Sequence, residues 1–384
     1  MSANSVSVII PCHNAAEHIA ACLNSVQKQS LHDVEVICVD DGSDDSTVEI
    51  IGGMATTSVK EIRLLRHECV KGVSAARNTG LRAAGGKYVF FLDADDTIYD
   101  EFSLQALYEA AEVAGNDVAI GRLLRWFPDT DERLPVAAFQ ADDVEFQETT
   151  ILRSPELVYN DRACGKLILK RLLTENSIYF DDNLLIYFEI PFSCRLYMAA
   201  ASIRILGKTV YISRLHTSES CIAAREEGPD AGEALLRVVA DLYAMTRDAA
   251  GHAAVFGQYL KQYTLKSLSL FMHVERIDAE ILTYVTVLRD LLNRVPSAFF
   301  LEDLKNIKDK IQYCDYRYAY TRIHNYIYRY KIYGYRKKLK IKIQKNTIEK
   351  LLNKISKKKY KIKKQIKRIE KYKQLDKEHK VTIV

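Results

Sequence analysis

Three aspartates follow a short apolar run and have the spacing of a divalent-metal site. The run KYVFFL (87–92) leads directly into Asp93, Asp95 and Asp96. In an extended segment, Asp93 and Asp95 point to the same side, because side chains alternate along a strand. Carboxylate oxygens are hard ligands that suit Mg²⁺ or Mn²⁺, and such an ion can bridge to a diphosphate. For this motif alone, the alternative is a solvated turn in which Asp96 caps a helix.

A second acidic pair, Asp40 and Asp41, ends the apolar run VEVICV (34–39). Taken alone, this pair is equally consistent with a turn, because Asp41 precedes Gly42 and Asp-Gly is a common turn dipeptide. The meaning of both clusters therefore depends on the elements that position them.

Strand-like and helix-like segments alternate over the first 125 residues. Runs rich in β-branched and aromatic residues predict strands, and apolar residues three or four apart predict helices. The predicted strands are 5–11, 34–39, 62–65, 87–92 and 117–124, and the predicted helices are 15–29, a short one ending at 51, 74–84 and 102–114. This order predicts an α/β domain with a mostly parallel sheet and helices on both faces. Ligands of such sheets bind beyond the carboxyl ends of the strands, where both acidic clusters lie.

Two common phosphate-binding motifs are absent from the sequence. No GxGxxG follows the first predicted strand, which argues against a dinucleotide-binding Rossmann site, and no GxxxxGK[ST] occurs, which excludes a P-loop. The first strand ends instead in PCHN (11–14). Phosphates must therefore be held without a glycine-rich loop, and a metal on the second acidic cluster would serve.

Four segments in this order and at this spacing resemble the family-2 glycosyltransferases, which have the GT-A (Rossmann-like) fold. They are SVIIPCHNA, VDDGSDDST, GVSAARNTG and GKYVFFLDADD, and the resemblance covers roughly residues 5 to 220. It implies a nucleotide-sugar donor, most often a UDP-sugar, and Mn²⁺ or Mg²⁺ as cofactor. It also implies a single displacement with inversion, in which an acceptor hydroxyl attacks the anomeric carbon without a covalent sugar–enzyme intermediate.

The resemblance assigns six residues to nucleotide binding, and one of them, Asp93, is also a candidate for the metal site. Pro11, His13 and Asn14 match the segment that lines the base pocket, and His13 stands where the family usually has tyrosine. Asp41 matches the residue that accepts a hydrogen bond from the uracil imide or the ribose. Arg77 matches the arginine that supports the base and that carboxylate.

The metal and diphosphate contacts also follow from the resemblance. Asp95 is the expected direct metal ligand, and Asp93 is expected to contact the ribose or a metal-bound water. His216 lies in a stretch like the loop that closes over the diphosphate, where it can contact the metal or a phosphate, and Arg214 could offset phosphate charge. The metal would neutralise the leaving nucleoside diphosphate.

The acceptor half departs from the family at its catalytic base. The family usually has a Glu-Asp pair that opens a helix, and its Asp is the general base. Here Glu189 aligns with the base and Phe188 with the preceding Glu. A glutamate is chemically competent to take a proton from an acceptor hydroxyl. The alternative is that Glu189 only stabilises a helix N-terminus. Asp181 and Asp182 are the further candidates for the base.

The charge is distributed unevenly along the chain. The net charge is +5, but residues 331–384 hold 21 Lys and Arg against 4 Asp and Glu, a net +17, and the remainder carries −12. We expect a GT-A catalytic domain over 1–230, with a nucleotide-sugar half (1–125) and an acceptor half (126–230). A helical domain (231–312) and a Tyr-rich, then Lys-rich, helical tail (313–384) would follow it.

The basic tail has three interpretations. It could lie as an amphipathic helix on the anionic inner leaflet of the membrane, form a coiled coil in a homo-oligomer, or remain solvated. No nucleic-acid-binding module accompanies the charge, so no nucleic acid partner is expected. The eight scattered cysteines form no CxxC pair and the chain has no apolar run long enough to span a bilayer. A cytoplasmic protein, peripheral on the inner face of the cell membrane, is therefore expected.

These observations predict a metal-dependent inverting glycosyltransferase. Its acceptor is expected to be a hydroxyl of a cell-surface glycan, such as capsule or lipopolysaccharide, or of a lipid-linked precursor. One alternative is a catalytically impaired scaffold in a glycan-assembly complex, because the Glu-Asp pair is altered at Phe188. Another is a nucleotidyltransferase that uses the same metal and nucleotide but releases pyrophosphate.

Overall fold

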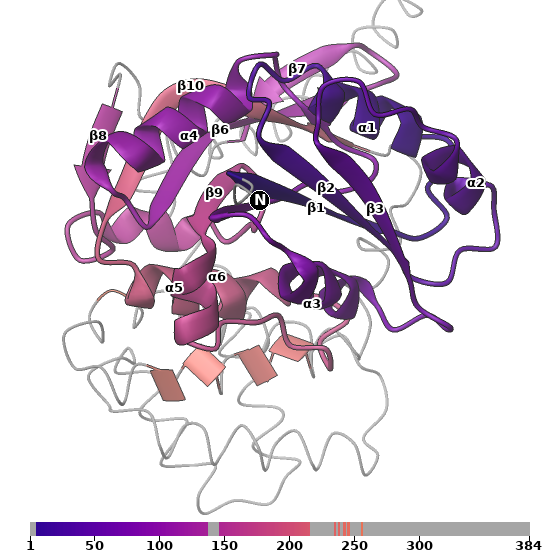
Figure 1. Ribbon diagram of the computed structural model, residues 1–384. Helices are drawn as coiled ribbons and strands as arrows, with labels where there is room; N and C mark the ends of the chain where they lie inside the picture. Colours follow the sequence, from indigo (N-terminus) through magenta and orange to yellow (C-terminus); the bar gives the residue numbers. More distant parts are fainter. Residues whose placement is uncertain are drawn as a thin grey trace, which may run out of the picture. The chain divides into compact units, whose positions relative to one another are not determined.

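The computed structural model describes residues 5–136 and 146–215, together with single positions between 234 and 255. Strands and helices alternate over the first half, as the sequence predicts (Figure 1). In chain order the elements are β1 (Val6–Cys12), α1 (Ile19–Gln27), β2 (Val34–Asp40), α2 (Thr47–Gly52), β3 (Glu61–Arg66), α3 (Val73–Ala83), β4 (Tyr88–Phe91), β5 (Thr97–Ile98), α4 (Ser103–Ala114), β6 (Val118–Phe127), β7 (Glu132–Pro135), β8 (Phe146–Thr149), η1 (Pro155–Tyr159), β9 (Lys166–Leu169), α5 (Lys170–Glu175), α6 (Glu189–Ala199) and β10 (Ile203–Arg214).

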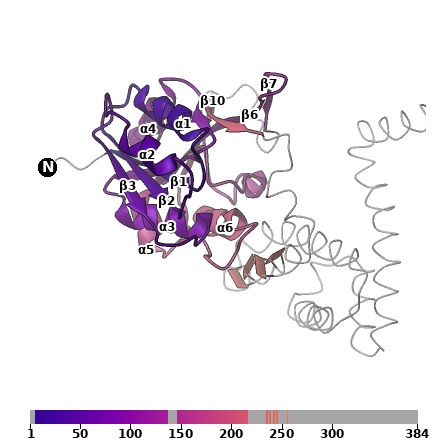
Figure 2. The ribbon, with the colours of Figure 1, turned by 90° about the vertical axis from the view of Figure 1, so that its right-hand side faces the viewer.

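The strands form one mixed sheet whose first half is entirely parallel. The order is β3-β2-β1-β4-β9-β6-β10-β5, and β7 pairs with β6 while β8 pairs with β10. The pairs β1–β2, β1–β4, β2–β3 and β6–β10 are parallel, which confirms the predicted fold class. The fifth predicted strand, β6, does not adjoin β4, because the short strand β9 lies between them. Figure 2 shows β6, β7 and β10 together at one end of the sheet.

The reversed direction of β9 brings a further chain segment to the edge where the first strands end. β9 is antiparallel to both β4 and β6, with Phe90 opposite Leu167 and Ile120 opposite Lys166. Its amino end therefore lies at the same edge of the sheet as the carboxyl ends of β4, β6 and β10. The loop that precedes β9 is thereby placed near the aspartates that follow β4.

Helices cover both faces of the sheet, as predicted. Successive side chains of β1 therefore belong to two different buried clusters, one on each face. Val8 and Ile10 pack with α1 and α4 on one face, whereas Ile9 packs with α3 and α6 on the other (Figure 1). Gly80 allows α3 to lie close against β1, since a Cβ at this position would overlap the Ile9 side chain. The core thus fixes the strand ends from two sides.

The described positions beyond β10 are helical, as the sequence predicts for this region. Leu235, Val238 and Leu242 belong to the same buried cluster as α6, and Arg195 of α6 pairs with Asp241 at 2.6 Å. The remainder of the expected helical domain (231–312) and the tail (313–384) lie outside the described residues, so the domain boundaries stay predictions. Among the described residues, no helix is long and apolar enough to cross a membrane.

Candidate active site

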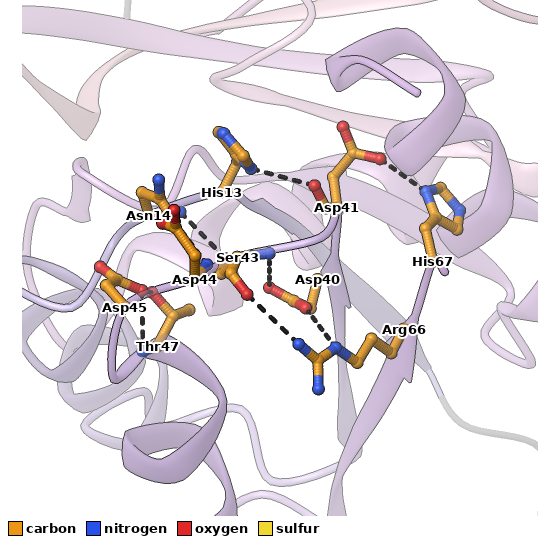
Figure 3. A network of polar contacts seen from close by, with 10 residues as sticks. All are labelled: His13, Asn14, Asp40, Asp41, Ser43, Asp44, Asp45, Thr47, Arg66 and His67. Atoms are coloured by element: carbon orange, nitrogen blue, oxygen red, sulfur yellow. Dashed lines mark hydrogen bonds and ion pairs between the residues drawn. The ribbon is translucent and has the colours of Figure 1, made fainter. Parts of the chain in front are cut away.

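The Asp41 carboxylate organises the loop between β3 and α3. It accepts hydrogen bonds from the backbone N–H groups of Lys71 at 2.9 Å and Gly72 at 2.7 Å. His67 Nδ1 donates to it at 2.7 Å, and Nε2 of the same ring accepts from the Thr79 hydroxyl at 2.9 Å. A carboxylate can only accept, and this settles which ring nitrogen of His67 carries the proton. Asp41 is therefore held by a buried network at the end of β2 (Figure 3).

The loop after β1 is tied to the loop after β2. His13 Nδ1 donates to the Asp41 carbonyl at 2.9 Å, and the Asn14 N–H donates to Ser43 Oγ at 2.9 Å (Figure 3). Asn14 has a φ of +48°, a left-handed conformation that asparagine tolerates better than most residues. Pro11 is buried in β1, whereas the side chains of His13 and Asn14 are exposed. The exposed imidazole is free to stack on a base from this loop.

A cavity of about 780 Å³ opens beside Asp41. Its walls are Gly42, Ser43 and the segment 66–70 at the end of β3. The volume lies within the roughly 300–1,000 Å³ range of small-molecule sites. The structure thus brings the predicted base-binding residues and a ligand-sized opening to one end of the sheet.

Arg77 joins the two halves of the site. Its Nη2 contacts Asp93 Oδ1 at 2.6 Å and its Nη1 contacts Glu189 Oε1 at 3.4 Å. The guanidinium packs against the rings of Phe180 and Phe188, 5.2 and 5.3 Å from their centroids, and its side chain is only 2% exposed. Burial alone would lower the pKa of Arg77, but the two carboxylates raise it above its usual value. The arginine is therefore a fixed cation between Asp93 and Glu189.

One expectation about this region needs correction. Arg77 was expected to support Asp41, but its ion pairs go to Asp93 and Glu189, while His67 and two backbone N–H groups hold Asp41. His67 was not predicted, because an isolated histidine carries no sequence pattern. Phe188, which replaces the family's glutamate, fills its position with a ring packed on Arg77.

The acidic cluster after β4 contains one buried and two half-buried carboxylates. Asp96 is not a helix cap: it is 4% exposed and accepts hydrogen bonds from the Tyr211 hydroxyl and the Arg214 N–H, each at 2.7 Å. Burial, followed by the charges of Asp93 and Asp95, raises the pKa of Asp96. Asp96 thereby fastens the end of β10 to the turn that carries Asp93 and Asp95.

The residues present fit a metal only in part. Asp93 and Asp95 offer hard oxygen ligands at the end of β4, but Asp93 also pairs with Arg77. Within the part of the chain that the structure describes, no three His, Cys, Asp or Glu side chains are grouped to hold a metal ion. A diphosphate would have to supply further ligands. His216 lies outside the described residues, and the Arg214 guanidinium stacks 4.4 Å from the centre of the Trp126 ring.

Glu189 is the first residue of α6, and its carboxylate is held through one oxygen, Oε1. Its Oε1 accepts from the Ala163 N–H at 2.8 Å, in addition to the contact with Arg77. None of the described residues donates to Oε2, and the side chain is 26% exposed. Tyr187, two residues earlier, has a φ of +58°, a conformation that is strained for an aromatic residue and that is concentrated at functional sites. Glu189 thus has one anchored oxygen and one that can accept a proton.

The other two candidates for the base have structural contacts. Asp182 accepts from Asn78 Nδ2 at 2.7 Å, and the same Asn78 group donates to the Phe180 carbonyl at 2.9 Å. Asp181 accepts from the N–H of Asn183 in an exposed turn at 2.9 Å. Neither carboxylate adjoins Arg77 in the described contacts, so Glu189 remains the best-placed base.

A buried lysine anchors the loop that leads to Ala163. Lys166 is 0% exposed, and its Nζ donates to Asn160 Oδ1 at 3.0 Å and to the Arg162 carbonyl. Burial lowers the pKa of Lys166 to about 8, although the nearby side chains of Cys164 and Glu189 oppose this effect. Sequence reasoning missed this role, because a lysine at the start of an apolar run does not reveal that it will be buried.

Comparison with known proteins agrees with this geometry. The model of glycosyl transferase family 2 matches residues 7–183. The uncharacterized glycosyltransferase EpsJ of Bacillus subtilis is 27% identical over 219 residues, which are 54% of this chain and 60% of EpsJ. WfgD of Escherichia coli, a UDP-Glc:α-D-GlcNAc-diphosphoundecaprenol β-1,3-glucosyltransferase, is 33% identical over 131 residues, 31% of this chain and 50% of WfgD.

Solved structures agree on the fold. S. aureus TarS 1–349 in complex with UDP-GlcNAc superposes with a TM-score of 0.67 at 22% identity, covering 86% of this chain and 92% of that one. The chain spans only about half to three-fifths of the length of WfgD and EpsJ. Residues 7–183 thus resemble glycosyl transferase family 2, and the chain shares the fold of TarS.

Proposed function

We propose that this chain transfers a sugar from a UDP-sugar to a hydroxyl of a glycan or lipid-linked acceptor, with inversion. The observation that carries the proposal is the bridge of Arg77 between Asp93, at the donor side, and Glu189, at the acceptor side. TarS binds UDP-GlcNAc in its solved complex, and WfgD is named for a UDP-Glc donor and a lipid-linked acceptor. These names support the substrate class and leave the particular sugar open.

In the proposed reaction, Glu189 Oε2 takes the proton of the acceptor hydroxyl. The hydroxyl oxygen then forms a bond to the anomeric carbon, and the bond from that carbon to the donor's diphosphate oxygen breaks. The electron pair of this bond leaves with the nucleoside diphosphate. Arg77 keeps Glu189 in position through Oε1 and pairs with Asp93 through its other terminal nitrogen. Asp41, His13 and the cavity at 66–70 would hold the nucleoside.

We assign the metal, Mn²⁺ or Mg²⁺, to Asp95 with help from Asp93. When bound, such an ion would stabilise the negative charge that develops on the diphosphate. Asp96 would act on the site indirectly, because its bonds to Tyr211 and Arg214 fix the turn that carries both ligands. His216 remains the candidate for a further contact to the metal or a phosphate.

The basic tail is proposed to hold the protein at the inner face of the membrane. Its net charge of +17 over residues 331–384 would attract anionic lipid by roughly 1 kcal/mol per cation near the surface. A lipid-linked acceptor is found at the same surface. Binding of the purified chain to vesicles with and without anionic lipid, at low and high salt, tests this placement.

Calorimetric titration with UDP, GDP, CDP and dTDP, with and without Mn²⁺, tests the function. We expect metal-dependent UDP binding that Asp95→Ala and Asp41→Ala abolish and that Asp129→Ala, a change at an exposed turn aspartate, leaves intact. Release of UDP from UDP-sugars then tests turnover. Binding of a different nucleoside diphosphate would replace the UDP-sugar in the proposal by another nucleotide sugar. A folded protein that binds none of the four would refute the proposed activity and favour a scaffold.

A further inference from the structure

A second cavity lies on the acceptor side of the sheet. It has a volume of about 240 Å³ and is enclosed by β6, the inner part of β10 and the segment 159–162. The charged residues of its wall are Arg122, Arg125, Asp161 and Arg162. Three arginines and one aspartate make this cavity basic, although the expected catalytic domain (1–230) has an excess of Asp and Glu over Lys and Arg.

Two of these arginines have no direct ion pair within the described residues, although Glu189, Asp161 and Asp93 act on Arg162 from beyond ion-pair distance. Neither the Arg125 nor the Arg162 guanidinium makes a hydrogen bond or an ion pair there, whereas Arg66, Arg77 and Arg195 each pair with an aspartate. Both side chains line the same cavity, and burial, followed by the charge of Arg162, lowers the pKa of Arg125. The planar guanidinium group offers N–H donors whose geometry matches the oxygens of a phosphate. Two guanidinium groups in one cavity can therefore bind the same phosphate.

The segment that carries Arg162 is rigidly anchored. The hydroxyls of Ser193 and Tyr197 donate to the carbonyls of Asp161 and Asn160, at 2.7 and 2.8 Å, and the buried Lys166 ties the same turn from inside. The turn ends at Gly165, whose φ of +71° suits glycine. A fixed backbone lowers the entropy that the arginine loses when it binds a ligand.

The same segment connects the cavity to the catalytic base. The residue after Arg162 is Ala163, whose N–H orients Glu189 at 2.8 Å. The charges of Glu189 and Asp93 are also close enough to oppose the effect of burial on Arg162 and to raise its pKa. An anion held by Arg162 would therefore lie beside the acceptor hydroxyl that Glu189 deprotonates.

We propose that this cavity binds a phosphate group of the acceptor, through Arg125 and Arg162. The inference rests on the proposed function, because it names the chemical class of the acceptor at that site. The cavity is smaller than the roughly 300 Å³ at which whole-ligand sites begin, so it suits one charged group and not an oligosaccharide. Both a lipid diphosphate and a phosphodiester polymer carry this group.

Arginine footprinting tests the subsite without relying on turnover. The full chain is treated with phenylglyoxal, and modification of Arg125 and Arg162 is followed by peptide mass spectrometry. The probes are farnesyl diphosphate and a glycerol phosphodiester oligomer, with farnesol and glycerol as uncharged controls. Each is tested with and without saturating UDP and Mn²⁺, so that binding in the donor site is separated from binding in this cavity. Arg171, an exposed arginine of α5, is the internal reference.

Protection of Arg125 and Arg162 by a phosphate probe, with Arg171 unprotected, is the expected result. Protection by the diphosphate alone assigns a lipid-linked acceptor, and protection by the oligomer alone assigns a polymer. Equal modification with every probe, in a protein that binds UDP, overturns the subsite and leaves the proposed function standing. Protection in a protein that fails to bind UDP would refute the proposed function and retain the subsite.

A variant gives the kinetic counterpart. Arg125→Ala should raise KM for a phosphate-bearing acceptor about tenfold, the loss expected from one charge-assisted hydrogen bond, and leave UDP binding unchanged. KM for the same acceptor without its phosphate should not change. Equal effects on both acceptors would contradict the proposal, and Arg171→Ala serves as the charge-matched control.

Discussion

Arg77 Nη2 contacts Asp93 Oδ1 at 2.6 Å, in the turn after β4, on the proposed donor side of the site. The second Nη of the same guanidinium reaches Glu189, which belongs to α6, more than a hundred residues later in the chain. A single buried cation therefore sets the distance between Asp93, in the proposed metal site, and Glu189, the proposed base. Reaction geometry depends on this distance more than on the affinity for either substrate.

Replacement of Arg77 by lysine should damage both activity and stability. A lysine ammonium is a point charge that cannot serve two carboxylates through separate nitrogens, so one of Asp93 and Glu189 loses its partner. We expect turnover to fall at least about 100-fold and the free energy of unfolding to fall by about 3 kcal/mol. UDP release and urea denaturation measure the two effects. Unchanged turnover in a folded variant would show that the bridge is not needed for catalysis.

Replacement of Glu189 by glutamine should remove the proton acceptor and keep the fold. The amide oxygen can still accept from the Ala163 N–H, so α6 should begin as before. We expect kcat to fall roughly 10²- to 10⁴-fold with UDP affinity unchanged, as is usual for the loss of a general base. Glu189→Asp, which restores a carboxylate, should recover part of the rate. If Glu189→Gln retains full turnover, the base is another residue.

The network around Asp41 should govern nucleotide affinity. His67→Ala removes the side-chain donor to Asp41 and loosens the loop at Gly72. We expect Kd for UDP to rise about tenfold, which corresponds to one hydrogen bond to a charged group. Thr79→Val removes only the outer bond of the network and should have a smaller effect. Calorimetric titration with UDP compares the wild type with both variants. Equal affinity of the wild type and His67→Ala for UDP would show that the nucleobase binds elsewhere.

Because of Lys166, the free energy of unfolding should change with pH in the alkaline range. Its pKa falls from 10.5 in the unfolded chain to about 8 in the folded protein. Between these values the unfolded state binds more protons, so stability rises with pH; below about pH 8 both states are protonated and the cost of burial is constant. Relative to Lys166→Met, the wild type should therefore gain up to about 3 kcal/mol between roughly pH 8 and 10.

Urea denaturation of both proteins across this pH range measures the difference, and Lys28→Met, at an exposed lysine, is the control. A constant difference between wild type and Lys166→Met would mean that Lys166 keeps an ordinary pKa inside the fold.

The regular elements of the first half could be predicted because each one buries a continuous apolar run or stripe. The predicted strand 34–39 is found as Val34–Asp40, and the predicted helix 102–114 as Ser103–Ala114. The two aspartate clusters were also predicted at strand ends, since the parallel order alone places them there. Glu189 was located by its position relative to Pro191 and is indeed the first residue of a helix.

The remaining features depend on contacts between distant segments. β9 has four residues and an unremarkable sequence, so its antiparallel place between β4 and β6 is visible only in three dimensions. The same is true of Asp96, whose partners Tyr211 and Arg214 follow it by more than a hundred residues. Arg77 was assigned to the wrong carboxylate because spacing along the chain does not reveal which acid lies across the sheet.

The reversed strand β9 also has a consequence for the order in which the protein forms during synthesis. The first four strands of the sheet pair with one another and can assemble while later residues are still in the ribosome. Until Lys166–Leu169 has emerged, the outer side of β4 has no neighbour and offers its backbone to any other extended chain. The nascent protein is thus most exposed to misassembly at the strand that leads into Asp93 and Asp95, and a chaperone that covers this edge would protect the candidate site before it is complete.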